Sequence, residues 1–202
     1  MEEKHITLPL TAGVSKELHA GDYVYISGII YSARDAAHKR MYDAIHAAGE
    51  DAVLKMNATE LFEAGILPLD LTDQTIYYLG PTPAREGKVI GSAGPTTASR
   101  MDKYTPLLLK KGLRGMIGKG KRSEDVRNAI VENGCVYFAA TGGAGALLSK
   151  CIKESEVLAY DDLGTEAIRK MRVENFPAIV IMDTEGNNLY ETAVEAYNQT
   201  KA

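Results

Sequence analysis

The chain has 202 residues, 45% of them hydrophobic, which is enough apolar content to bury a sizeable core in one or two domains. Its formal net charge of −4 argues against general binding to nucleic acid or to anionic membranes, because those partners usually call for a basic surface. No apolar run approaches the roughly 18 residues that span a bilayer, and no signal-peptide pattern follows the first residues, so we expect a cytoplasmic protein.

The first half of the chain predicts strands and one long helix. Strands are expected over 5–10 and 22–32, which are rich in β-branched and aromatic residues, with a bulge at Gly28. A helix is expected from about residue 34 to Gly49. Residues 57–73 are interpreted as a connection with one helical turn at 60–64. Strands are then expected over 74–79 and 88–93, joined by a hairpin-like connection.

The central stretch 91–102, GSAGPTTASRMD, predicts a glycine-rich turn that enters a helix continuing to about Lys111. Pro95 suits a first helical turn, and the following Thr and Ser residues offer hydroxyls for capping. Such a turn points backbone N–H groups at the positive end of a helix, and Arg100 adds a planar fork for a carboxylate or phosphate. An anion site is one hypothesis, and an ordinary connecting loop is the alternative.

The second half alternates strands and helices. Strands are expected over 115–118, 136–140, 157–160 and 178–183, and helices over 123–134, from about 144 to Cys151, and over 166–171, before a polar, helical tail. This predicts a single α/β domain over 1–202, with a first half richer in antiparallel strands and a parallel α/β unit in the second half.

Three glycine-rich loops, at 91–102, 118–122 and 142–145, follow predicted strands. Loops that leave the carboxyl ends of strands converge on one edge of an α/β sheet, where they would collect Arg100, Lys119 and backbone N–H groups around one small anion. Neither nucleotide-binding motif fits. A P-loop needs glycine where Leu113 stands, and a dinucleotide fingerprint needs a small residue where Leu148 stands.

Arg34 and His38 lie four residues apart and share one helix face near its N-terminus. That face can meet an anion. The alternative is that Arg34 and Asp35 are solvated charges and that His38 is an ordinary surface histidine.

The two cysteines, Cys135 and Cys151, are fewer than the three or four thiolates that an iron–sulfur cluster takes. This chain alone is therefore not expected to hold such a cluster. Cys135 precedes an apolar strand pattern, which favours a buried structural thiol.

Four segments occur in a distinctive order: RDAAH at 34–38, GPTTASRM at 94–101, GKGKRS at 118–123 and ENFPA at 174–178. Together they resemble the β subunit, or equivalently the C-terminal domain, of class I iron–sulfur fumarate hydratase and its relative L-tartrate dehydratase. The resemblance runs from about residue 9 to about residue 190 and leaves a polar tail.

The resemblance implies a swivelling β/β/α domain with a mixed, barrel-like first half. It implies a hydro-lyase of the tricarboxylic acid cycle that reversibly hydrates fumarate to L-malate, active only with an α subunit, in an assembly expected to be α2β2. The α subunit would supply three cysteines to a [4Fe–4S] cluster whose fourth iron is a Lewis acid. This chain would then hold no metal, in agreement with its cysteine count.

The resemblance also implies roles for six residues. Arg34 and Arg100 are the implied carboxylate clamps, because a small dianion offers little apolar area and charge-assisted bonds must orient it. Thr96 is the implied catalytic base, and Lys119 contacts substrate and assists catalysis. Asp35 and His38 are candidates for supporting the clamps.

Two features depart from the family pattern: Lys121 stands where Asn is frequent, and the stretch 58–73 is longer than usual. The Lys-Arg-Ser continuation after Gly120 favours the fumarase branch. The alternatives are an L-tartrate dehydratase β subunit and a non-catalytic anion- or nucleotide-binding module.

Overall fold

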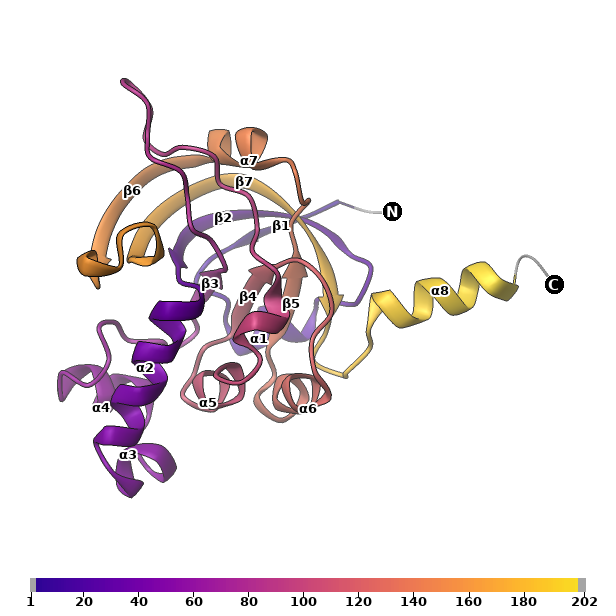
Figure 1. Cartoon of the computed structure of the whole chain (residues 1–202). Coiled ribbons are helices and arrows are strands. Elements are labelled where there is room, and N and C mark those ends of the chain that lie inside the picture. Colours follow the sequence, from indigo (N-terminus) through magenta and orange to yellow (C-terminus); the bar gives the residue numbers. More distant parts are fainter. Residues whose placement is uncertain (1–2, 200–202) are drawn as a thin grey trace.

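A computed structural model describes residues 3–199 of the chain. Within these residues, seven strands form one mixed sheet, flanked by helices (Figure 1). The strands are β1 (Glu3–Thr7), β2 (Tyr23–Ser32), β3 (Thr75–Tyr77), β4 (Gly115–Gly118), β5 (Val136–Ala139), β6 (Ile152–Ala159) and β7 (Ile168–Met182). The helices are α1 (Ala12–Lys16), α2 (Asp35–Ala47), α3 (Glu50–Leu54), α4 (Ala58–Glu63), α5 (Thr105–Lys110), α6 (Glu124–Asn133), α7 (Gly145–Cys151) and α8 (Leu189–Gln199), with 3₁₀ turns η1 (Ala98–Met101) and η2 (Asp161–Glu166).

Strand β7 closes the sheet into a barrel. The strand order is β1-β2-β3-β4-β5-β7-β6, and a further pairing of β2 with β7 joins the five strands β2, β3, β4, β5 and β7 in a ring. Neighbours along β1-β2-β3-β4-β5 are parallel, whereas β7 runs antiparallel to β2, β5 and β6. The predicted α/β class with a mixed, barrel-like sheet is confirmed. The antiparallel pairings, however, all come from β7 and are not concentrated in the first half.

Parallel strands give the barrel a rim at which several chain segments meet. The carboxyl ends of β2, β3, β4 and β5 lie at the same end of the ring. Because β7 is antiparallel and its residue Arg169 pairs with Ser32 at the end of β2, the start of β7 lies at this rim too. The segments after four strands and before a fifth are therefore neighbours in space.

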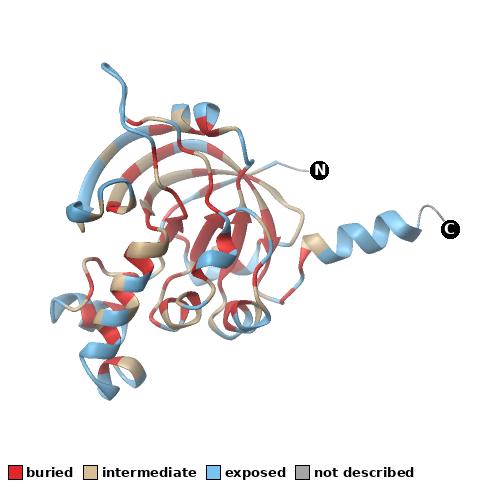
Figure 2. Cartoon of the chain, in the orientation of Figure 1, coloured by how far each residue is buried: buried red, intermediate tan, exposed pale blue. Residues whose placement is uncertain are grey.

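The central strands β3, β4 and β5 bury both faces, so they read as continuous apolar runs. Along β3 and just beyond it, Ile76 and Tyr78 pack in an outer core against the helices, while Tyr77 and Leu79 pack in an inner core with residues from every barrel strand. The alternation follows from the two-residue period of a strand. Figure 2 shows the central strands of the barrel as buried, whereas β6 is mainly exposed and α8 extends away from the body and is largely exposed.

The predicted bulge at Gly28 is confirmed. The β2–β7 register shifts between Ile26 and Gly28, and a side chain on Gly28 would come within 3.0 Å of Leu8 in addition to meeting a φ of +123°. Opposite the bulge, the Asn175 N–H donates to the Ser27 hydroxyl at 3.0 Å. Phe176 is fully buried in the inner core, so the ENFPA segment serves packing.

Several local predictions are also confirmed. Ser123 caps α6 by accepting from the Val126 N–H, and Gly134 ends that helix in the left-handed conformation. Cys135 is buried, its thiol donates to the Leu113 carbonyl, and burial raises its pKa to about 12. The turn expected at 60–64 belongs to α4, and α3 precedes it. The predicted helical tail is α8, although residues 200–202 lie outside the described part.

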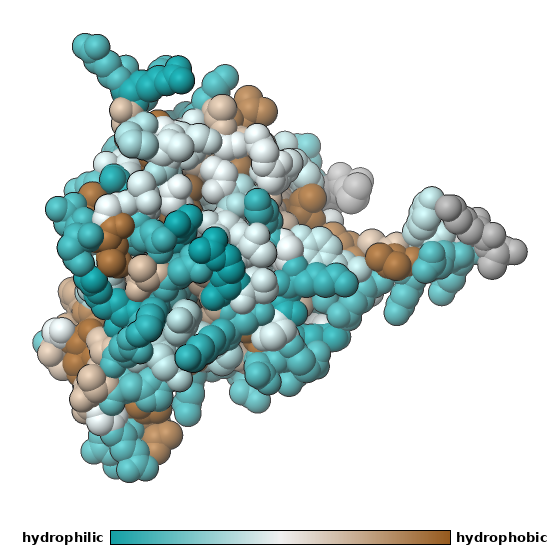
Figure 3. All heavy atoms as spheres, viewed as in Figure 1, coloured by the Kyte–Doolittle hydropathy of each residue, from teal (hydrophilic) through white to brown (hydrophobic). Residues whose placement is uncertain are grey.

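Three predicted elements are wrong. No strand forms over 88–93, because β3 already pairs with β2 on one side and β4 on the other, which leaves no edge for a hairpin. Residues 82–89 instead form an exposed, hydrophilic arm that projects from the body (Figure 3).

The single-domain prediction over 1–202 extends beyond the described residues and stays a prediction.

The other two errors concern helices. The helix expected from Arg100 to Lys111 is divided into η1 and α5, because Pro106 lacks an N–H and starts α5 anew. The helix expected over 166–171 is the beginning of β7, where Met171 pairs with Ile30 on one side and Ser155 on the other. Pairing on both sides overrides local propensity there.

A buried arginine fixes the loop after β4. The Arg122 side chain is fully buried, and its Nε donates to the Asp102 Oδ1 at 2.6 Å while Nη2 donates to the Thr105 hydroxyl at 2.9 Å. Its guanidinium also lies over the rings of Tyr78 and Tyr137, at 5.3 and 5.0 Å. Arg122 thus ties the loop after β4 to the segment between η1 and α5.

Helix α2 carries a second buried polar group into the outer core. His38 is fully buried, its Nδ1 lies 3.1 Å from the Arg34 carbonyl, and its ring meets the Tyr78 ring edge-on at 5.2 Å. Burial lowers the pKa of His38 to about 4, with a smaller opposing effect from the Arg34 carbonyl. The imidazole is therefore neutral at pH 7, and the expectation of a surface histidine is wrong.

Replacing Arg122 with Met should lower the free energy of unfolding by about 3–5 kcal/mol, because the largely buried Asp102 carboxylate loses its cation. The matched control is Arg40→Met, which breaks an exposed ion pair with Asp162 and should cost at most about 1 kcal/mol. Urea denaturation of both variants measures the difference. Equal losses would contradict the anchoring role of Arg122.

His38 should make stability fall on mild acidification. Its folded-state pKa lies below its unfolded value, so the unfolded state binds more protons and stability present above about pH 6.5 is lost as pH falls toward 4. Between pH 7.5 and 5.5 the wild-type loss from this group is about 1.4 kcal/mol. Denaturation at both pH values should show that loss reduced in His38→Gln and retained in His46→Gln, since His46 is exposed.

Candidate active site

The first candidate clamp residue, Arg34, lies between β2 and α2 at the barrel rim. It is the N-cap residue of α2, with extended backbone, and its side chain gives that helix no capping bond. The guanidinium instead points to Glu166 at the end of η2, where Nη2 donates to the Oε1 at 2.6 Å. This bond holds the guanidinium in place, and because the side chain is 25% exposed it remains accessible to a ligand.

The second candidate clamp residue, Arg100, lies in η1 and is joined to the first through Asp35. The Arg100 Nε donates to the Asp35 Oδ1 at 2.7 Å, across 65 residues of sequence. The other oxygen of Asp35 lies 3.9 Å from the Arg34 Nε. Asp35 therefore lies between the two arginines, and the structure brings the RDAAH and GPTTASRM segments together.

Thr96 and Lys119 are joined through their backbones. The Lys119 N–H donates to the Thr96 carbonyl at 3.2 Å, and the Ala98 N–H donates to the Lys119 carbonyl at 2.8 Å, a short parallel bridge. The Thr96 N–H donates to the Tyr78 carbonyl at 2.7 Å. Tyr78 is also the ring against which His38 packs, so the two halves of the site share one buried support.

The third glycine-rich loop lies beside the other two. A Cβ on Gly142 would lie 3.5 Å from the Lys119 Cδ and 3.9 Å from its Nζ. Farther along, the Ala93 N–H donates to the Gly145 carbonyl at 3.0 Å, and a side chain on Gly145 would collide with Ser92. The predicted convergence of the three loops is confirmed.

The electrostatic source of the site differs from the prediction. The helix after Pro95 is only η1, a 3₁₀ turn of four residues, and its N-cap Thr97 makes no side-chain capping bond. The N–H groups of Thr96 and Ala98 are used within the fold. The cationic groups that the structure places at the rim are the side chains of Arg34, Arg100 and Lys119, and no long helix begins at this loop.

Two residues that support the candidate site were not identified from the sequence. Glu166 holds Arg34, yet it is one acidic residue in a stretch that predicts an ordinary helix. Arg122 is buried, yet it ends a basic run in which nothing distinguishes it from Lys121, which is exposed. A gap of 132 residues separates Arg34 from Glu166, so no local pattern marks the pair.

No group of three or more His, Cys, Asp or Glu side chains suited to a metal ion occurs among residues 3–199. Cys135 is occupied as a buried thiol, and Cys151 is half-buried. The described side chains therefore do not fit an iron–sulfur cluster. In the same range, none of the helices is long and apolar enough to cross a membrane.

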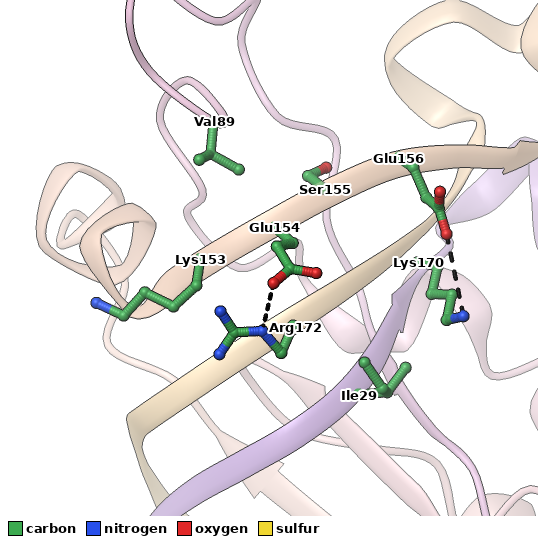
Figure 4. Close-up of a pocket in the computed structure, with 8 residues that line it drawn as sticks. All are labelled: Ile29, Val89, Lys153, Glu154, Ser155, Glu156, Lys170 and Arg172. Carbon is green, nitrogen blue, oxygen red and sulfur yellow. Dashed lines mark hydrogen bonds and ion pairs between the residues drawn. The ribbon is translucent and has the colours of Figure 1, made fainter.

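A hollow of about 510 Å³ lies elsewhere, against β6 and β7 (Figure 4). Most of its charged side chains are paired: the Arg172 Nε donates to Glu154 at 2.7 Å, and Lys170 lies 4.0 Å from Glu156. It includes none of the predicted site residues, so we place the candidate site at the rim.

The comparisons with known proteins agree with the segments noted in the sequence. The family model described as "Fumarase C-terminus" matches residues 2–193. The chain is 38% identical to the anaerobic class I fumarate hydratase of Escherichia coli (strain K12) over 171 residues. These residues make up 84% of this chain and 28% of that protein. It is 36% identical over 197 residues to a putative class I fumarate hydratase of Geobacillus stearothermophilus, covering 94% and 34%.

A shorter relative matches over most of its length. The putative L(+)-tartrate dehydratase subunit beta of Methanocaldococcus jannaschii is 36% identical over 188 residues, which cover 90% of this chain and 88% of that subunit. The chain thus spans about a third or less of the two fumarate hydratases, and nearly the whole of a protein named as a subunit. From the family match and these relatives together, we conclude that the chain belongs to the Fumarase C-terminus family.

Proposed function

We propose that this chain is the β subunit of a two-subunit, cytoplasmic iron–sulfur hydro-lyase that interconverts fumarate and L-malate. The observation that carries the proposal is the ion pair between Asp35 and Arg100 beside Arg34, because it brings two arginines from distant segments together. Two guanidinium groups at one rim suit a small dicarboxylate, which must be oriented by charge-assisted hydrogen bonds. The relatives named fumarate hydratase support this substrate.

We assign a role to each candidate residue. Arg34 and Arg100 bind the carboxylates, Lys119 contacts substrate, and Thr96 exchanges the proton at the substrate carbon. Asp35 orients Arg100, and the neutral imidazole of His38 donates from its Nδ1 to the Arg34 carbonyl. An ordinary hydroxyl is a weak base, so Thr96 needs a cationic neighbourhood or a second group that takes the proton.

The cluster belongs to the partner in this proposal. Because the described side chains offer no ligand set for it, we assign the [4Fe–4S] cluster to an α subunit, in an α2β2 assembly. The relative named as a subunit beta supports a chain of this length that works with another. That relative also makes L-tartrate dehydration the second candidate, since the chain covers 88% of it.

Activity should require both subunits and the clamp. We expect fumarate to be hydrated anaerobically only when this chain and a cluster-loaded α subunit are mixed. Arg100→Ala should lower kcat/KM by about 10- to 100-fold through loss of a charge-assisted bond. Arg40→Ala is the matched control, since Arg40 is another accessible arginine paired with an aspartate. L-tartrate is assayed in parallel. A cluster-loaded mixture inert toward both diacids would favour the non-catalytic binding module.

The proton-transfer role of Thr96 predicts a specific kinetic pattern. Thr96→Val keeps the shape of a nearly buried side chain and removes its hydroxyl, so kcat should fall by about 100-fold or more while KM changes little. Thr97→Val removes an exposed neighbouring hydroxyl and should leave both constants unchanged. A rise in KM at constant kcat for Thr96→Val would make Thr96 a binding residue instead of the base.

A further inference from the structure

The carboxylate of Glu166 contacts two parts of one clamp. Its Oε1 accepts from the Arg34 Nη2 at 2.6 Å, and its Oε2 accepts from the Ala36 N–H at 2.9 Å. Arg34 is the N-cap residue of α2 and supplies no capping bond itself, so Glu166 satisfies a free N–H at the start of that helix. One carboxylate thus joins the clamp side chain to the first turn of the helix that carries it.

Arg34 has a second, steric constraint. A Cβ on Gly80 would lie 3.0 Å from the Arg34 Nη1 and 3.1 Å from both Cζ and Nε. Three guanidinium atoms are therefore nearly equidistant from that point, and the group lies over the glycine because no side chain stands there. Gly80 follows β3, whereas Glu166 precedes β7, so separate strands fix the guanidinium from two sides.

Each of the two arginines makes its hydrogen bond to a different carboxylate, although the second oxygen of Asp35 also lies 3.9 Å from the Arg34 Nε. Glu166 serves Arg34, and Asp35 serves Arg100. Burial raises the pKa of Glu166, but the hydrogen bonds from Arg34 and Ala36 outweigh it, so the pKa lies below its usual value and the carboxylate is ionised at neutral pH. A charge-assisted bond of this kind holds a guanidinium in one orientation.

We propose that Glu166 is a positioning residue: together with Gly80, it fixes the guanidinium of Arg34 in the orientation that receives a substrate carboxylate. This inference rests on the proposed function of Arg34 as a clamp. It contrasts with a purely structural role, in which Glu166 only tethers η2 to α2. The chain offers a matched pair for that comparison, because Arg40 and Asp162 join the same two elements through bonds of 2.7 and 2.6 Å.

The first test is a double-mutant cycle in the reconstituted two-subunit enzyme. Glu166→Gln should raise KM for the diacid about tenfold with a smaller change in kcat, and should have no further effect on kcat/KM when Arg34 is already Ala. Glu166→Asp, which keeps the charge, should recover part of the loss. Gly80→Ala, which leaves Glu166 in place, should also raise KM, because the guanidinium must shift. Asp162→Asn is the control and should leave both constants unchanged.

The second test does not depend on turnover. Phenylglyoxal modification of the full chain, followed by mass spectrometry, reports how accessible each guanidinium is. Glu166→Gln should raise the modification rate at Arg34 several-fold and leave that at Arg100 unchanged, and Asp162→Asn should alter neither.

The outcomes separate the two proposals. Unchanged Arg34 modification in Glu166→Gln, or a full additional loss from Glu166→Gln in the Arg34→Ala background, overturns the positioning role. A cluster-loaded wild-type enzyme that is inert toward both diacids, with Arg34 released as expected in the modification assay, overturns the proposed function instead.

Discussion

The antiparallel strand β7 determines how the site is assembled. Its pairing with both β2 and β5 closes the ring, and its direction brings its first residues to the end at which β2, β3, β4 and β5 finish. Arg34 follows β2, Gly80 follows β3, Lys119 follows β4, and Glu166 precedes β7. A β7 that ran parallel to β2 would carry Glu166 to the opposite end of the ring. The chemistry at the rim therefore depends on strand direction as much as on the residues themselves.

The proposed clamp is organised by contacts within the chain itself. Asp35 holds Arg100, and Glu166 holds Arg34, so both guanidinium groups have an orientation in the chain alone. Holding a flexible arginine in place lowers the entropy lost when it binds an anion. Each carboxylate also reduces the net positive charge at the site. Such a site gains orientation and loses some long-range attraction for anions. That balance would suit the proposed substrate, whose two carboxylates must be placed precisely relative to a reacting carbon.

Elements that depend on residue type and short-range spacing can be predicted from the sequence. The strand over 22–32, the bulge at Gly28 and the Ser123-capped helix α6 all follow from residue type and spacing, and the structure has them. The predicted helix at 166–171 is wrong because pairing with β2 and β6 decides that segment. The candidate site shows the same difference between local and long-range signals. Ordered motifs identify Arg34, Thr96, Arg100 and Lys119 as candidates. Glu166 and Gly80 contact Arg34 from distant parts of the chain, and no motif spacing reveals those contacts.

The exposure of the proposed clamp is a physical reason to expect that a second protein surface covers it. Half of the Arg100 side chain is accessible, Lys119 is exposed, and Asp35 is about a third accessible. Ion pairs with a small dianion are weak in such surroundings, because water screens them and competes for the same donors. The strength of the same contacts rises when a covering surface excludes water. The rim thus carries an oriented set of cationic groups whose affinity depends on what covers it, and a partner subunit that brings its own reacting group would supply that cover.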